Sequence, residues 1–108
     1  MLKIEGEIGN TIMYNNIVRL SFSFPFSEIA NSTASVMYIG KTFDLFVVHE
    51  KIKYKFANAI LYRLVIEHDG DSKLIVEIEP KDMDISFSEL QDLRDTTVIV
   101  ALKPIELR

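Results

Sequence analysis

The sequence predicts an all-β fold, mainly antiparallel, in which about eight strands form a meander that closes into a barrel-like domain or folds into a sandwich. Three observations support this class. Apolar and polar residues alternate with period two along most of the chain, short turn-forming segments separate the alternating stretches, and helical spacing occurs only near residues 87–94. The alternation does not distinguish a barrel from a sandwich.

The size and composition predict one folded β domain over residues 1–108. The 108 residues match a usual domain length, and 48% of them are hydrophobic, which is enough to form a core. The chain has no cysteine, so disulfides and thiolate metal sites are excluded. The fold therefore depends on packing alone.

A first hairpin is expected to turn at residues 9–11, placing Ile8 opposite Ile12 so that both apolar faces coincide. The second strand then extends over residues 12–26 and is rich in aromatic residues. Pro25 lacks an N–H donor and is expected to mark the end of its pairing. Residues 27–33 are expected to form a polar connection.

A three-stranded unit is expected over residues 34–56, with tight turns at Gly40-Lys41 and His49-Glu50. The second turn would place Val47 opposite Ile52. Because a His-Glu pair is poorly suited to the positive φ of a tight hairpin turn, a bend or bulge is an alternative there.

From Ile52 to Ile66, every even position except Asn58 holds a large apolar or aromatic residue, which predicts one apolar face throughout. The small segment Ala57–Ala59 allows either a turn or one long strand. The turn is favoured because most strands have about 3–10 residues.

The next hairpin joins strands 60–67 and 73–79 in a register that places Tyr62 opposite Ile78. Charge complementarity selects the same register, because it brings Arg63 opposite Glu77. Ser86 and Glu89 then form the pattern of a capping box, which predicts the short helix over residues 87–94. A last strand is expected over residues 96–102, ahead of Pro104.

Composition and motifs argue against catalysis and against several classes of partner. The net charge of −4 disfavours nucleic acid and anionic membranes. No phosphate loop, nucleophile motif or metal-binding helix pattern occurs, so we expect no enzyme, cofactor or metal site. His68 lies in the acidic segment 67–71, for which a plain hairpin tip is the favoured interpretation. The lack of a signal-peptide pattern or a long apolar segment predicts a cytoplasmic protein, or one assembled in a cytoplasm.

The candidate interaction residues fall into three groups: aromatic residues of the long strand, an alternating run of lysines, and two apolar residues expected to meet on the second face of the later hairpin. They are Phe22, Phe24, Phe26, Lys51, Lys53, Lys55, Val65 and Ile75. For the lysines, solubilising or protecting a strand edge is the favoured interpretation.

We therefore expect a non-enzymatic structural or protein-interaction module that binds itself or another protein, such as a self-assembling virion or tail-like subunit. One alternative is a closed barrel that carries a small apolar ligand. The other is an acidic inhibitor of a basic protein, because the carboxylates are concentrated in the second half of the chain.

Overall fold

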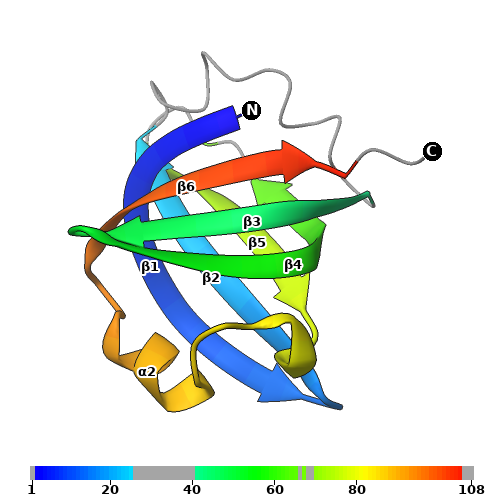
Figure 1. Ribbon diagram of the computed structural model, residues 1–108. Helices are drawn as coiled ribbons and strands as arrows, with labels where there is room; N and C mark the ends of the chain where they lie inside the picture. The colour runs from blue at the N-terminus through cyan, green and yellow to red at the C-terminus, as the bar shows by residue number, and fades with distance from the viewer. Residues whose placement is uncertain (1, 26–40, 66, 68–69, 106–108) are drawn as a thin grey trace.

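The computed structural model describes residues 2–25, 41–65, 67 and 70–105. Six antiparallel strands form a closed barrel in the order β1-β2-β5-β4-β3-β6, with β6 pairing again with β1 (Figure 1). The strands are β1 (Leu2–Tyr14), β2 (Ile17–Pro25), β3 (Thr42–His49), β4 (Ile52–Val65), β5 (Asp71–Ile78) and β6 (Thr97–Pro104). The all-β class is confirmed, and the fold is a barrel. The described residues contain six strands rather than about eight.

Alternating side chains of all six strands fill the barrel. On β2, every second residue from Val18 to Phe24 points inward and is fully buried. The largest buried side chains include Phe22, Phe24, Phe43 and Phe56, each without exposed surface. Because small barrels have only enough interior for side chains, these four rings account for much of the packed core.

The first hairpin turns at Asn15-Asn16, so the expected turn at residues 9–11 is wrong. Both asparagines have positive φ, 50° and 61°, as a type I′ turn requires of its two central residues. Ile8 consequently lies opposite Phe22 on β2 rather than opposite Ile12.

Residues 9–11 instead belong to an irregularity inside β1. The register shifts between Ile8 and Thr11, and both of these side chains point inward. The extra residue reverses the alternation, as a β-bulge does. Ile12 and Tyr14 are therefore on the outer surface, whereas a constant alternation had grouped them with the core residues of β2.

The β3–β4 hairpin turns one residue later than expected, at Glu50-Lys51, where Glu50 has a φ of 58°. Val47 therefore lies opposite Tyr54, not Ile52. The expected strand at 34–39 lies outside the described residues, and so does Gly40 of the preceding turn.

Strand β4 is continuous, so the expected turn at Ala57–Ala59 is wrong. Asn58 takes a positive φ of 53° within the strand, and the alternation changes there. Ala59 and Leu61 point into the core, while Ile60 and Tyr62 point outward. A second register shift lies between Leu61 and Arg63.

These irregularities also change the β4–β5 register. Glu77 lies opposite Ile60, and Ile75 lies opposite Arg63. The expected Arg63–Glu77 pair is therefore wrong. Glu77 instead pairs with a cation on its other neighbouring strand, Arg19 of β2.

The connection from β5 to β6 contains the 3-10 helix η2 (Pro80–Asp82) and the helix α2 (Phe87–Asp92), which lies at one end of the barrel (Figure 1). Leu90 is fully buried in the core cluster. The helix start predicted at Ser86 is confirmed: Ser86 Oγ accepts from the Glu89 N–H at 3.2 Å, as an N-cap residue does, and its hydroxyl donates to Glu89 Oε1 at 3.0 Å.

Replacing Ser86 with alanine is expected to lower the free energy of unfolding by about 1 kcal/mol, because the first turn of α2 loses its side-chain acceptor. Urea unfolding followed by circular dichroism measures this difference. Gln91→Ala, at an exposed position of the same helix, is the control and should change stability by less than about 0.5 kcal/mol. Equal losses in both variants would contradict the capping role.

Candidate interaction surface

Four large apolar side chains gather on the outer surface of β1 and β4, around an ion pair on β2 and β5. We call this surface the tyrosine face. The exposed fractions are 48% for Ile12, 46% for Tyr14, 41% for Ile60 and 49% for Tyr62. Ile12 lies opposite Arg19, Arg19 lies opposite Glu77, and Glu77 lies opposite Ile60. These four residues therefore form one row across β1, β2, β5 and β4.

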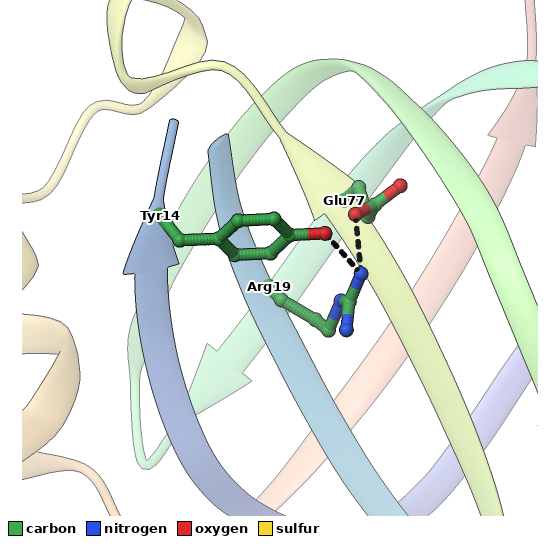
Figure 2. Close-up of polar contacts among 3 residues, drawn as sticks. All are labelled: Tyr14, Arg19 and Glu77. Carbon is green, nitrogen blue, oxygen red and sulfur yellow. Dashed lines mark hydrogen bonds and ion pairs between the residues drawn. The ribbon is translucent and has the colours of Figure 1, made fainter. Parts of the chain in front are cut away.

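Arg19 is the centre of the tyrosine face. Its Nη2 donates to Glu77 Oε2 at 2.9 Å and to the Tyr14 hydroxyl at 2.6 Å (Figure 2). Its guanidinium carbon also lies 4.1 Å from the ring centroid of Tyr62 and 5.1 Å from that of Tyr14. Both distances fall within the range of cation–π contacts.

The ion pair is shielded by these rings, since the side chains of Arg19 and Glu77 are only 21% and 23% exposed. The hydrogen bond to Glu77 raises the pKa of Arg19 above its usual value. The two charges offset each other. The tyrosine face therefore combines an apolar and aromatic rim with an internally paired centre.

A shallow groove of about 420 Å³ adjoins the tyrosine face and shares Ile60 and Glu77 with it. Three carboxylates and one lysine are among its lining residues: Glu77, Glu79, Asp82 and Lys81. Lys81 forms an exposed ion pair with Glu79 at 3.1 Å. Because Glu77 pairs with Arg19 and Glu79 pairs with Lys81, the groove keeps one net negative charge, that of Asp82.

A second outer surface, formed by β3, β4 and β6, is basic and partly apolar. We call it the lysine face, and it consists of Phe46, Val48, Lys53, Lys55 and Ile99. Lys53 Nζ lies 4.5 Å and Lys55 Nζ lies 6.0 Å from the ring centroid of Phe46. Ile99, opposite Val48, is 43% exposed.

The structure places the candidate interaction residues in different environments. Phe22 and Phe24 are fully buried inside the barrel, so in this conformation they pack the core and have no surface to offer a partner. Phe26 lies outside the described residues. Val65 and Ile75 are half-buried and lie opposite Lys73 and Arg63, not opposite each other as expected.

The lysines are exposed, with Lys51 in the β3–β4 turn and Lys53 and Lys55 on the outer surface of β4. Lys53 and Lys55 both lie near the ring of Phe46, an aromatic residue on the neighbouring strand β3. Whether these residues bind a partner stays a prediction.

Sequence reasoning missed the tyrosine face because it assigned Tyr14, Ile60 and Tyr62 to buried apolar faces. One feature of the sequence does indicate the correct first turn. Asn15-Asn16 is a suitable pair for a tight hairpin turn, and a turn there would have placed Arg19 and Tyr14 on adjoining strands.

The described part of the chain contains no group of three or more His, Asp or Glu side chains arranged to hold a metal ion. Within that same part, every helix is too short or too polar to cross a membrane.

No protein-family model, curated protein or solved structure matches this chain.

Proposed function

We propose that this protein is a non-enzymatic interaction module that self-associates through its tyrosine face. The observation that carries the proposal is the gathering of Ile12, Tyr14, Ile60 and Tyr62, each more than 40% exposed, around the half-buried Arg19–Glu77 pair. Tyrosine and arginine are enriched among the residues that contribute most to protein–protein binding, whereas scattered single apolar residues are ordinary on a surface.

The rigidity of the surface also supports this proposal. Its residues lie on neighbouring strands of a closed barrel, and Arg19 is fixed by two hydrogen bonds and two ring contacts. A surface ordered before binding loses less side-chain entropy when a partner docks. The interior packing of Phe22, Phe43 and Phe56 favours this function over that of a small-molecule carrier.

The test is size-exclusion chromatography with light scattering over a range of protein concentrations. The wild-type mass should rise above the monomer mass of 12.4 kDa as concentration increases. Tyr62→Ala should weaken association at least about thirtyfold, as expected for truncation of a central aromatic contact worth about 2 kcal/mol. Its ring is half exposed, so the barrel should remain folded.

Gln91→Ala is the control, because this exposed residue on α2 lies outside the tyrosine face. It should associate like the wild type. A wild-type protein that stays monomeric at every concentration, or a Tyr62→Ala variant that associates normally, would refute the proposal.

A further inference from the structure

The centres of the tyrosine and lysine faces lie on opposite strands of the barrel, although both faces extend onto β4. Around the ring β1-β2-β5-β4-β3-β6, strand β2 is three positions from β3 in either direction, and β5 is three positions from β6. The tyrosine face is centred on Arg19 of β2 and Glu77 of β5. The lysine face is centred on Phe46 of β3 and Ile99 of β6. One contact can therefore leave the opposite face of each copy free.

The charges of the two sides are complementary. The tyrosine face and its groove carry three carboxylates, Glu77, Glu79 and Asp82, against two cations, Arg19 and Lys81, which leaves one net negative charge. The lysine face presents Lys53 and Lys55 on the exposed outer surface of β4, and these two cations outnumber the Asp84 carboxylate that accepts from the Lys55 backbone N–H. Glu5, opposite Ile99, lies at the far edge of this face on β1. Opposite charges across an interface favour association and fix its orientation.

The aromatic chemistry is complementary as well. In this barrel, cations already lie against aromatic rings on both faces: Arg19 between Tyr14 and Tyr62, and Lys53 beside Phe46. An exposed lysine of one copy can make the same contact with a half-exposed tyrosine ring of another, with a carboxylate of the groove close by. Apolar residues border both sets of charges, as in the core and rim of protein interfaces.

On this basis, and resting on the proposed function, we propose that the tyrosine face of one copy binds the lysine face of the next. The contact joins two different surfaces, so the assembly is head-to-tail and grows into a ring or an open filament. A two-fold contact between two tyrosine faces would instead bring two acidic grooves into the same interface, in a protein whose net charge is already −4. The head-to-tail arrangement replaces that repulsion with attraction.

Two variants, each altered on one face, test this arrangement. Ile60→Ser with Tyr62→Ser removes the two apolar side chains that β4 contributes to the tyrosine face, and Lys53→Glu with Lys55→Glu reverses the charge of the lysine face. All four positions are exposed, so both proteins should fold. Each variant alone should be monomeric in light scattering at concentrations at which the wild type associates.

An equimolar mixture of the two variants should form a species of twice the monomer mass and nothing larger. The intact tyrosine face of the lysine variant binds the intact lysine face of the tyrosine variant, and the altered faces stop further growth. Raising the salt concentration should dissociate this dimer, because the pairing of exposed charges is screened.

The possible failures separate the two proposals. If the lysine variant alone associates like the wild type, or if the mixture stays monomeric, the head-to-tail arrangement is refuted while self-association stands. If the wild type itself is monomeric throughout, both proposals are refuted.

Discussion

Replacing Gly6 with alanine is expected to destabilise the barrel by about 3 kcal/mol, the upper end of the usual cost of overpacking a core. Gly6 is buried on β1, opposite Val98 of β6. A Cβ atom there would overlap with the carbonyl oxygen of Ser23 and with the ring of Phe24, whose Cε1 would lie 2.6 Å away. The ring is confined by the core, and the oxygen belongs to the backbone of a paired strand, so neither can move freely.

Gly9→Ala is the matched control, on the same strand. The nearest atom to a Cβ at this position is the Ser21 carbonyl oxygen at 3.4 Å, an ordinary van der Waals distance. This variant should differ from the wild type by less than about 0.5 kcal/mol. Urea unfolding followed by circular dichroism compares the two, and similar stabilities for both variants would contradict the steric role assigned to Gly6.

The features of the fold that could be predicted from the sequence are those set by neighbouring residues. Alternation from Val18 to Phe24 predicts the buried face of β2, and the Ser86–Glu89 pair predicts the start of α2. In both cases the signal is contained within a few residues. Strand period and helix capping depend only on that local geometry.

Strand registers were harder to predict because one extra residue reverses every later side chain. The irregularity after Ile8 and the positive φ of Asn58 each act in this way. The expected alternation took Asn58 as part of a turn that kept the faces unchanged. The structure keeps the strand continuous and changes the faces instead, which is possible because asparagine tolerates a left-handed conformation.

The candidate surface depends on those two irregularities. Without the irregularity after Ile8, the side chains of Ile12 and Tyr14 would point into the barrel. Without the positive φ of Asn58, the side chains of Ile60 and Tyr62 would point into the barrel. Four large apolar side chains are thus exposed by local departures from regular alternation, at sites where regular strands would have added them to the core. Bulges often redirect side chains beside functional sites, which supports an interaction role for the residues that these two expose.

Phe22→Ala is expected to cost about 3–5 kcal/mol of stability, because removing a buried aromatic side chain loses its transfer free energy and leaves a cavity. Phe22 lies on β2 between Ile8 of β1 and Leu74 of β5, and its ring centroid lies 6.2 Å from that of Phe24. A closed ring of strands has little freedom to collapse into the space. Urea unfolding measures the loss.

Tyr62→Ala is the matched control, since it removes another aromatic ring, but from the outer surface. Its loss of stability should be about 1 kcal/mol or less, the strength of an exposed cation–π contact with Arg19. The two variants should thus separate folding from association: Phe22→Ala lowers stability, while Tyr62→Ala mainly weakens self-association. If Tyr62→Ala lost as much stability as Phe22→Ala, Tyr62 would be part of the structural core, and its weakened association would no longer support an interface.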